Sequence, residues 1–295
     1  MTHRVAGAVA YFTRPYPSGW AVNDACCSGL STAGPPLCTA ACKWSTVCAM
    51  AALAPNPPLV TAIMPTRDRP EFALQAVRYF CDQDYPNKEL IVMEDGTPSL
   101  TGRLPDDPRI RYIATGAPLR SIGAMRNEAC QLARGEIVAH WDDDDWYGPQ
   151  RLTPQVAAIR SGEADLTALR DSLMLDLATW RFWRCQPDLH RRIFYIGDVH
   201  GATMMYRRRI WEEAKFPDQS LAEDAIFLDQ ALRMGARLKA IDAEGLFIYV
   251  RHGANAWEME CGQYGGTDGW ETVPEPDMAT DARTFYSALS AAAPK

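Results

Sequence analysis

The sequence has no hydrophobic run long enough to cross a membrane. A transmembrane helix needs about 20 predominantly apolar residues in a row, and no stretch of the 295 residues approaches that length. Residues 1–17 place one arginine ahead of a very short apolar stretch and then reach two prolines, which makes a poor secretory signal peptide. These absences predict a cytoplasmic protein without a transmembrane segment, and they leave peripheral contact with a membrane open.

The sequence has fewer basic than acidic residues. Lys and Arg number 30 against 37 Asp and Glu, which gives a net charge of -7 and a pI of about 5.3. This balance argues against nucleic acid as a main partner, and a phosphorylated ligand would need local cations. Hydrophobic residues make up 47% and charged residues 23%, as in ordinary soluble globular proteins, and the length predicts one large domain with a sizeable core.

The cysteines include no Cys-x-x-Cys pair of the kind that binds zinc. Residues 1–57 hold a cluster of five cysteines, are rich in small residues and Pro, and show no periodicity. The missing Cys-x-x-Cys pair and the distance to His3 argue against a small metal-binding module. The expected cytoplasmic location argues against a disulfide-bonded peptide. We therefore predict a poorly ordered N-terminal extension over residues 1–57. The clustered cysteines are Cys26, Cys27, Cys38, Cys42 and Cys48; the scattered ones, expected to be small buried hydrophobes, are Cys81, Cys130, Cys185 and Cys261.

Regular apolar periodicity begins at residue 58. Short apolar runs alternate with segments of helical spacing, and this alternation predicts an α/β fold with a mainly parallel sheet. The first run is expected to stop at Pro65, and the second helix to begin at Ser121 as its N-cap and to end at Gly135. Expected strands are 59–64, 89–93, 109–114, 136–141, 164–169, 172–183, the start of 201–214, 237–241 and 245–250; expected helices are 70–83, 121–135, the end of 201–214 and 222–235.

Three polar clusters follow predicted strands. They read PTRDR at 65–69, EDGT at 94–97 and DDDD at 142–145. In sheets of this class, ligands bind beyond the carboxyl ends of the strands. We therefore expect the three clusters to converge on one crevice although they lie far apart in the sequence.

The four consecutive aspartates lie between Trp141 and Trp146. In an extended segment their side chains alternate sides, and like charges so close together repel each other. Mg²⁺ or Mn²⁺ prefers carboxylate oxygens and keeps positions open for phosphate; the alternative is a solvated acidic loop, or acids at the start of the following helix. The position at a strand end favours the cation. A calcium EF-hand is excluded, because the required sixth Gly and twelfth Glu, counted from Asp142, are Tyr147 and Thr153.

Four segments, in this order, together resemble the family 2 glycosyltransferases of the GT-A fold. They are the Pro-Thr-x-Asp-Arg opening through EDGT (63–97), the Arg-Asn helix with the DxD-type aspartates and Pro-x-Arg-Leu (123–152), the Glu-Asp segment (216–235), and YVRHGANAW with its His-x-x-Asn element (249–257). The resemblance covers residues 59–255. It implies a GT-A domain, Rossmann-like with a mainly parallel sheet flanked by helices, over 58–253, and a C-terminal tail over 254–295 that packs on or near the active site.

The resemblance implies metal-dependent, inverting transfer of a sugar from a nucleotide-diphosphate donor to an acceptor hydroxyl. Asp224 would be the general base that takes the proton of the acceptor hydroxyl as it attacks the anomeric carbon. Asp144 would bind Mn²⁺ or Mg²⁺ directly, with His252 as a further metal or diphosphate contact, and the cation would stabilise the leaving diphosphate. The residues implied in binding the nucleotide sugar are Pro65, Thr66, Asp95, Arg126, Asp142 and Asp143.

Structural roles compete for several of these residues. For Asp224 the alternative is a first-turn acid favoured by the helix dipole, and for His252 it is a hydrogen-bonded structural histidine. Arg67 and Arg69 either neutralise the local acids or are solvated. Asp68 is expected to cap a turn.

The sequence lacks the Gln-x-x-Arg-Trp motif of the processive polysaccharide synthases in this family, so the resemblance implies a single-addition enzyme. A UDP-sugar is the favoured donor, and a glycan, lipid-linked or small-molecule hydroxyl is the acceptor. Two rival functions stay open. One is a nucleotidyltransferase on a related sheet, although no Gly-rich phosphate loop follows the first strand; the other is a non-catalytic sugar- or peptide-binding relative.

Overall fold

The computed structural model describes residues 56–116, 119–194 and 198–292. The chain divides into two units after residue 52, and every element below belongs to the second unit, Leu53–Lys295. The extension predicted over residues 1–57 and its cysteine cluster lie outside the described residues, except for residues 56 and 57.

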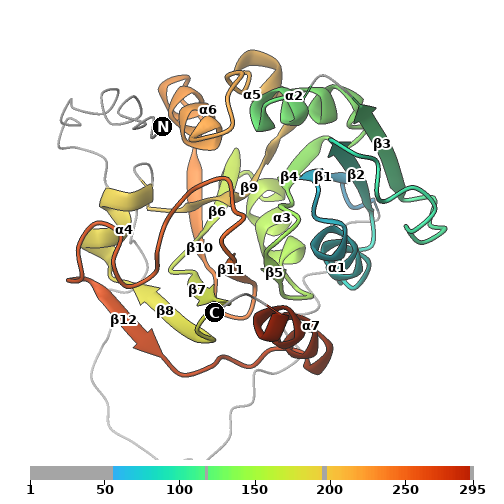
Figure 1. The fold of residues 1–295 in the computed structure, drawn as a ribbon. Coiled ribbons are helices and arrows are strands. Elements are labelled where there is room, and N and C mark those ends of the chain that lie inside the picture. Colours follow the sequence, from blue (N-terminus) through green and yellow to red (C-terminus); the bar gives the residue numbers. More distant parts are fainter. Residues whose placement is uncertain (1–55, 117–118, 195–197, 293–295) are drawn as a thin grey trace, which may run out of the picture. The chain divides into compact units, whose positions relative to one another are not determined.

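A mixed seven-stranded sheet forms the centre of this unit (Figure 1). Its order is β10-β6-β9-β4-β1-β2-β3, and among the described strands of this sheet only β9 runs antiparallel to its neighbours. The expectation of a mainly parallel α/β sheet is confirmed. The strands are β1 (Val60–Arg67), β2 (Lys88–Asp95), β3 (Ile110–Gly116), β4 (Ile137–His140), β6 (Leu166–Arg170), β9 (His200–Arg207) and β10 (Leu238–Asp242).

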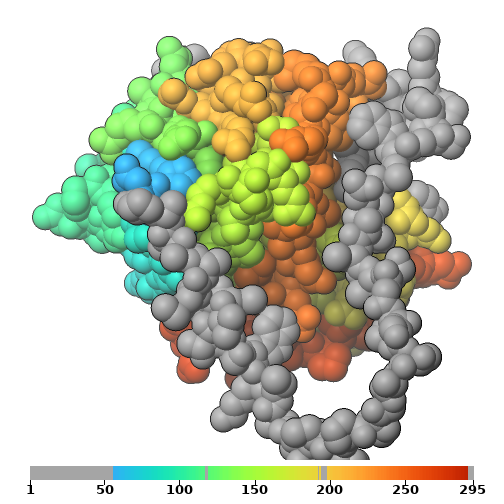
Figure 2. Space-filling model, turned by 180° about the vertical axis from the view of Figure 1, so that it is seen from behind, coloured from blue at the N-terminus to red at the C-terminus, as the bar shows by residue number. Residues whose placement is uncertain are grey.

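Helices flank the sheet because its central strands are apolar on both faces. Every residue of β2 is buried, and β1 is buried as far as Thr66, as expected for parallel strands covered on both sides. Helices α2, α5 and α6 gather along one side of the unit, seen from the front in Figure 1 and from behind in Figure 2. The helices are α1 (Pro70–Cys81), α2 (Ile122–Leu132), α3 (Leu152–Arg160), α4 (Pro187–Phe194), α5 (Arg208–Glu213), α6 (Glu223–Arg233) and α7 (Thr280–Ala292).

The start of α2 follows from its first residues. The Oγ of Ser121 accepts a hydrogen bond from the backbone N of Ala124 at 3.0 Å, which satisfies one of the amide groups that a helix leaves unpaired at its N-terminus. The predicted N-cap is confirmed. The helix ends at Leu132 rather than at Gly135, because Ala133 already has extended backbone angles.

A second, five-stranded sheet has the order β12-β8-β7-β11-β5. The prediction of one strand over residues 172–183 is wrong, because this segment is a hairpin. The carboxylate of Asp176 accepts hydrogen bonds from the backbone N of Ala178 at 3.0 Å and the Oγ1 of Thr179 at 2.6 Å, and such an Asx turn reverses the chain. The strands are β5 (Trp146–Tyr147), β7 (Leu173–Asp176), β8 (Arg181–Cys185), β11 (Phe247–Arg251) and β12 (Trp270–Val273).

The expectation that the first strand stops at Pro65 is also wrong, since β1 continues to Arg67. On the β4 side of β1, the carbonyl group of Leu59 accepts a hydrogen bond from the backbone N of Ile137, at the start of β4. The carbonyl group of Ile63 accepts one from the backbone N of Trp141, just after β4. Pro65 is the next residue that faces this side, and β4 has ended at His140 by then. The missing amide hydrogen of Pro65 therefore breaks no hydrogen bond between the strands.

The C-terminal segment contains an element that the sequence pattern did not predict. In α7, the ring of Phe285 packs edge-on against Phe72 of α1, with ring centroids 5.9 Å apart, so this helix is held against α1. Among the described helices, none combines the length and the apolar character that a bilayer crossing requires.

Candidate active site

The ends of β1 and β2 meet at one edge of the seven-stranded sheet, and β4 ends at the same edge. In the parallel register, Arg67 at the end of β1 is level with Asp95 at the end of β2. The Oγ1 of Thr66 donates to Oδ2 of Asp143, just beyond β4, at 2.6 Å. The convergence predicted for the three polar clusters is confirmed, because parallel neighbours present their carboxyl ends on one side.

Arg69 joins the two middle aspartates. Its Nε lies 3.2 Å from Oδ2 of Asp143, and its Nη1 donates to Oδ2 of Asp144 at 2.6 Å. Burial raises the pKa of Asp143, and the charge of Arg69 only partly offsets this effect. For Asp144, burial acts in the same direction, but Arg69 and His252 outweigh it and lower the pKa. Of the two alternatives for Arg69, neutralisation of the local acids is therefore the one that the structure supports.

Asp144 also receives donors from the far end of the chain. Nε2 of His252 lies 3.0 Å from Oδ2 of Asp144, and Nδ2 of Asn255 donates to the same oxygen at 3.1 Å. The side chain of Asn255 accepts from the backbone N of His252 at 2.9 Å, so the His-x-x-Asn element forms one closed turn after β11. The ring of His252 stacks on Phe72, with ring centroids 4.4 Å apart. Residues 254–295 thus contribute a side chain directly to this site.

Asp145 binds the protein backbone rather than Arg69 or His252. It is buried, and its Oδ1 accepts a hydrogen bond from the backbone N of Val250 at 2.9 Å. Burial and the charge of Asp144 raise its pKa well above the ordinary value. The expectation of strictly alternating side chains is wrong, since Asp143 and Asp144 share one arginine. The physical reason is the bend over residues 143–145, which leads the chain into β5.

Arg126 of α2 lies behind the first aspartate and has only 3% of its surface exposed. Its Nη2 donates to Oδ1 of Asp142 at 2.9 Å, its Nη1 contacts Nδ1 of His140, and its Nε lies 3.3 Å from Oε1 of Glu223. Burial opposes the charge of Arg126, but Asp142 and Glu223 outweigh burial and raise its pKa. Burial, followed by the charge of Arg126, lowers the pKa of His140 well below the ordinary value. The arginine is therefore charged and the histidine neutral at pH 7.

Glu223 and Asp224 open α6 after Ala222, whose φ of 59° places it in the left-handed region. Glu223 turns inward to Arg126 and is 5% exposed, and burial together with the charge of Asp224 raises its pKa. Asp224 is partly exposed and lies over Gly201, where an added Cβ would be 1.8 Å from its Oδ2. Because β9 is antiparallel to β4, Gly201 lies at the same edge as the aspartates.

Asp95 is fully buried and bound by protein donors on both oxygens. Its Oδ2 accepts from Nε of Arg67 at 3.0 Å and from the backbone N of Arg120 at 2.9 Å, and its Oδ1 accepts from Thr115 at 2.8 Å. Burial alone would raise the pKa of Asp95, and these donors lower it. Arg67 thus neutralises an acid.

Asp68 occupies a tight turn beside this pair. Its φ is 54°, in the left-handed region, and its Oδ1 accepts a hydrogen bond from the backbone N of Thr97 at 3.4 Å. Asp tolerates this conformation better than most residues because its short side chain can bond nearby backbone groups. This hydrogen bond reaches the loop after β2 rather than the turn of Asp68 itself, so the expected role as a turn cap stays a prediction.

The side chains that could hold a metal ion are the carboxylates of Asp142, Asp143 and Asp144 and the imidazole of His252, and Arg69 now pairs with both Asp143 and Asp144. Within residues 56–116, 119–194 and 198–292, no group of three or more His, Cys, Asp or Glu side chains is arranged to hold a metal on its own. Mg²⁺ binds through one or two carboxylates and completes its shell with substrate phosphates and water. The donor set therefore fits a cation that binds together with a diphosphate, at the place where Arg69 supplies positive charge in the structure.

Comparison with protein families agrees with this geometry. The model named Glycosyl transferase family 2 matches residues 61–213. The colanic acid biosynthesis glycosyl transferase WcaA of Escherichia coli (strain K12) is 37% identical over 213 residues, which cover 67% of this chain and 75% of WcaA.

The chain belongs to glycosyl transferase family 2.

Other relatives and structures extend this result. The glycosyltransferase is 27% identical to the succinoglycan biosynthesis protein ExoO of Rhizobium meliloti (strain 1021) over 67% of its length, but spans only 62% of ExoO. The structure of S. aureus TarS in complex with UDP-GlcNAc aligns with a TM-score of 0.53 and 19% identity, over 70% of this chain and 62% of TarS. The mannosyltransferase PcManGT from Pyrobaculum calidifontis, in complex with GDP-Man and Mn²⁺, aligns with a TM-score of 0.52 and 18% identity, over 67% and 57% of the two chains.

These similarities settle the fold and the class of enzyme. The two solved structures share the α/β fold expected of a GT-A domain. Family membership makes the protein a glycosyltransferase and sets aside the nucleotidyltransferase and the non-catalytic relative. The roles implied for individual residues stay predictions.

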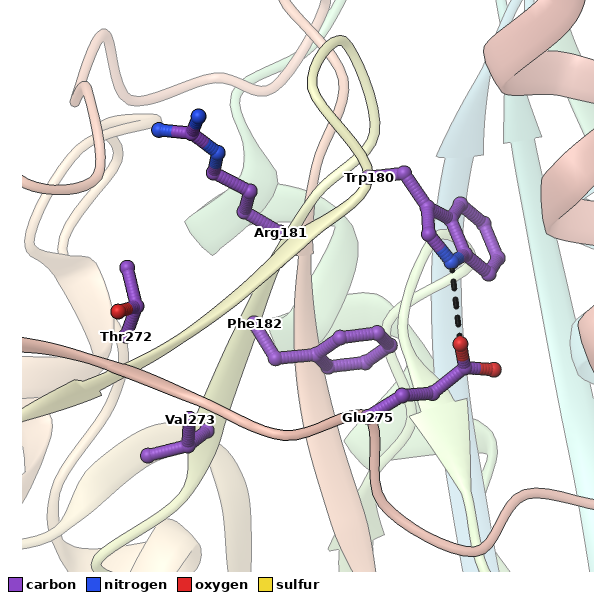
Figure 3. A pocket seen from close by; sticks show the side chains of 6 residues that line it. All are labelled: Trp180, Arg181, Phe182, Thr272, Val273 and Glu275. Atoms are coloured by element: carbon purple, nitrogen blue, oxygen red, sulfur yellow. Dashed lines mark hydrogen bonds between the residues drawn. The ribbon is translucent and has the colours of Figure 1, made fainter.

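A cavity of about 480 Å³ in the glycosyltransferase contains none of the residues implied in catalysis. The indole Nε1 of Trp180 donates to Oε2 of Glu275 at 3.2 Å, whereas Arg181 extends away from this pair (Figure 3). The lining side chains do not converge on one point, so we place the active site at the strand ends instead. The cavity is lined by Trp180, Arg181, Phe182, Thr272, Val273 and Glu275.

Three residues of the glycosyltransferase site have no role assigned by the sequence pattern. The sequence leaves two alternatives open for Arg69 and shows Asn255 and Glu223 only as members of the His-x-x-Asn element and the Glu-Asp segment. A signal existed for each, because Arg69 belongs to the PTRDR cluster, Asn255 follows His252 by three residues, and Glu223 precedes the implied base.

Proposed function

We propose that this glycosyltransferase moves one sugar from a nucleotide-diphosphate donor to an acceptor hydroxyl, with inversion and with the help of a divalent cation. The observation that carries the proposal is the joint position of the acids on one sheet edge. Asp142, Asp143 and Asp144 follow β4, and Asp224 lies over Gly201 at the start of the neighbouring strand β9. Transfer requires the bound sugar donor and a proton acceptor to lie within reach of the same anomeric carbon. The position of these four acids on one edge supports such an arrangement.

On the donor side, we assign the cation, Mn²⁺ or Mg²⁺, to Asp144 with His252 and Asp143 beside it. When bound, such a cation offsets the negative charge that develops on the leaving diphosphate. Base and ribose are assigned to the ends of β1 and β2, at Pro65, Thr66 and Asp95. In this proposal Asp95 meets the base when one of its present donors gives way. A UDP-sugar is the favoured donor, and the similar structure of TarS contains UDP-GlcNAc while that of PcManGT contains GDP-Man and Mn²⁺.

On the acceptor side, we assign the general base to Asp224. The acceptor oxygen forms its bond to the anomeric carbon as the bond to the diphosphate oxygen breaks, and the acceptor proton passes to the Asp224 carboxylate. Attack from the face opposite the leaving group inverts the anomeric centre. Asp224 is partly exposed, whereas Glu223 is 5% exposed and ion-paired with Arg126. This difference in exposure supports Asp224 rather than Glu223 as the proposed base.

The test is a donor screen with a matched variant. Thermal shifts with UDP, GDP, dTDP and CDP, with and without Mn²⁺, identify the base, because a ligand of the native state raises the melting temperature. The matching nucleotide sugars are then assayed for release of the diphosphate. We expect turnover by the wild type and none by Asp224→Asn, with the nucleotide still bound. Absence of turnover of every nucleotide sugar by the wild type, slow hydrolysis included, would refute the proposal.

A further inference from the structure

We infer that Arg126 is a positioning residue, which fixes Asp142 on the donor side and, through Glu223, Asp224 on the acceptor side in one geometry. This inference rests on the proposed function, in which Asp224 takes the proton of the acceptor. It assigns to Arg126 a role other than the contact with base or phosphate that the family resemblance implies.

Burial is the first argument. Arg126 is 3% exposed and Glu223 is 5% exposed. The guanidinium hydrogen-bonds Asp142 through Nη2 and contacts His140 through Nη1, and its Nε makes no hydrogen bond with the described residues but lies 3.3 Å from Oε1 of Glu223 in an ion pair. Nη1 and Nη2 each keep a second N–H, but with 3% of Arg126 exposed a donor molecule could reach these groups only if the packing around the side chain opened.

The second argument is where the partners come from. Arg126 lies on α2, Asp142 follows β4, and Glu223 is the first residue of α6. A guanidinium is planar and presents its N–H groups in a fixed fork, so it sets distances more tightly than a flexible ammonium. One side chain therefore fixes the start of α6 relative to the end of β4.

The next residue along the chain reinforces the same junction. The Nδ2 of Asn127 donates to the carbonyl of Phe216 at 2.8 Å, and its Oδ1 accepts from the backbone N of Phe216 at 3.0 Å and from Nε1 of Trp211 at 2.9 Å. These partners lie on α5 and on the segment that leads to α6. The Arg-Asn pair thus connects α2 to the α6 region in two places. Arg126 pairs with Glu223 at the start of α6, and Asn127 bonds the backbone of Phe216 in the segment before it.

The position of Asp224 then follows from that of Glu223. The two residues are neighbours on one helical turn, so the direction of one fixes the direction of the other. With Glu223 drawn inward, Asp224 lies over Gly201 at the sheet edge. Without Arg126, no side chain of the described residues would link Glu223 at the start of α6 to Asp142 after β4, and the start of α6 would be free to shift relative to the sheet edge.

The experiment is a double-mutant cycle on the full chain with the donor identified above. We expect Arg126→Met and Glu223→Ala each to lower kcat by about 100-fold, the cost of a small misplacement of a reacting group. The KM for the donor and the Kd for its nucleoside diphosphate should change by less than about 3-fold, because Arg126 does not touch the donor and the backbone of Asp142 stays bonded to the hydroxyl of Tyr147. The double variant should be no slower than the slower single variant, since both remove one and the same constraint.

Two further variants separate positioning from folding. Glu223→Gln keeps an oxygen that can accept from Arg126, so we expect it to retain more activity than Glu223→Ala at a similar melting temperature. Arg134→Met is the matched control, because Arg134 pairs with Glu89, which is 2% exposed and lies at the start of β2, away from the strand ends. It should lower the melting temperature and leave kcat unchanged.

The outcomes are distinct. A loss of diphosphate affinity of about 10-fold or more in Arg126→Met, at nearly unchanged kcat, would place Arg126 on the donor and overturn the inference. Additive losses in the double variant would overturn it as well, while an active wild type with an inactive Asp224→Asn would still support the proposed function. A wild-type enzyme that turns over no nucleotide sugar would refute the proposed function and, with it, this inference.

Discussion

The carboxylate of Asp224 lies so close to the backbone of Gly201 that a single methyl group at position 201 would be 1.8 Å from its Oδ2. The next nearest atoms are the Cγ and Cβ of the same aspartate, at 2.6 and 3.1 Å. The three atoms nearest to such a methyl group all belong to the proposed base, which makes Gly201 a test of where Asp224 must lie.

Gly201→Ala should disable transfer while preserving the fold. The methyl group meets the end of a side chain that can rotate, so the melting temperature should fall by only a few degrees. The displaced Asp224 would lose its alignment with the acceptor, and we expect kcat to fall by about 100-fold. In an Asp224→Ala background the same substitution should have no further effect on the residual rate. A fully active Gly201→Ala enzyme would show that Asp224 is not the base.

Replacement of Arg69 should make stability depend on a divalent cation. Arg69→Met removes the charge that offsets Asp143 and Asp144, and we expect a loss of about 2 kcal/mol in the free energy of unfolding. Mn²⁺ should restore part of this loss, because a cation that binds the native state stabilises it by mass action. The measurement is a urea titration in EDTA and in Mn²⁺. An equal response of wild type and variant to Mn²⁺ would contradict a cation at these carboxylates.

Removal of Asn255 should weaken the binding of cation and diphosphate together. Asn255→Ala loses the donor to Asp144 and the acceptor for the backbone of His252, so both implied metal contacts lose their support. Residues that orient metal ligands typically contribute 10- to 100-fold in affinity, and we expect a weaker Kd by about 10-fold. Calorimetry with the diphosphate and Mn²⁺ measures this. An unchanged Kd would show that Asn255, and with it the C-terminal segment, does not support donor binding.

Glu94 provides a pH test of the loop after β2. It accepts hydrogen bonds from both backbone and side chain of Ser99 and from the backbone of Leu100. Burial alone would raise its pKa, but these donors and Tyr112 lower it below the ordinary value of 4.5. A lowered pKa contributes stability that is present above the ordinary pKa and is lost as the pH falls through the folded-state pKa.

Accordingly, Glu94→Gln should be less stable than the wild type by about 2 kcal/mol at pH 7. The difference should shrink as the pH falls below 4.5, because the wild type then loses the contribution that the variant lacks. Urea titrations at several pH values give the comparison. A difference that stays constant at acid pH would mean that Glu94 is not held as a carboxylate.

A chain that begins at Met50 should retain full activity. Every strand, helix and site residue described above lies after Leu53, and residues 1–57 are predicted to be an extension outside the catalytic domain. Melting temperature and kcat of the shortened chain should equal those of the full chain. A folded but inactive shortened chain would give the cysteine-rich segment a part in catalysis.

The sequence by itself determined the secondary structure around the site and the chemistry at the strand ends. Apolar runs and helical spacing depend only on neighbouring residues, so β1, β2, α1 and α2 could be predicted within a few residues. The clusters PTRDR, EDGT and DDDD were visible at the strand ends, and the parallel topology placed them on one edge.

Only the tertiary structure decided which charge neutralises which. Arg69 meets Asp144 across 75 residues, and His252 meets it across 108, and no local pattern encodes such pairings. The continuation of β1 past Pro65 depended on where β4 ends, and the position of Asp224 depended on the space at Gly201. Periodicity reports how a residue relates to its neighbours in the chain, whereas the geometry of this site arises from contacts between segments that meet only when the sheet and its helices pack.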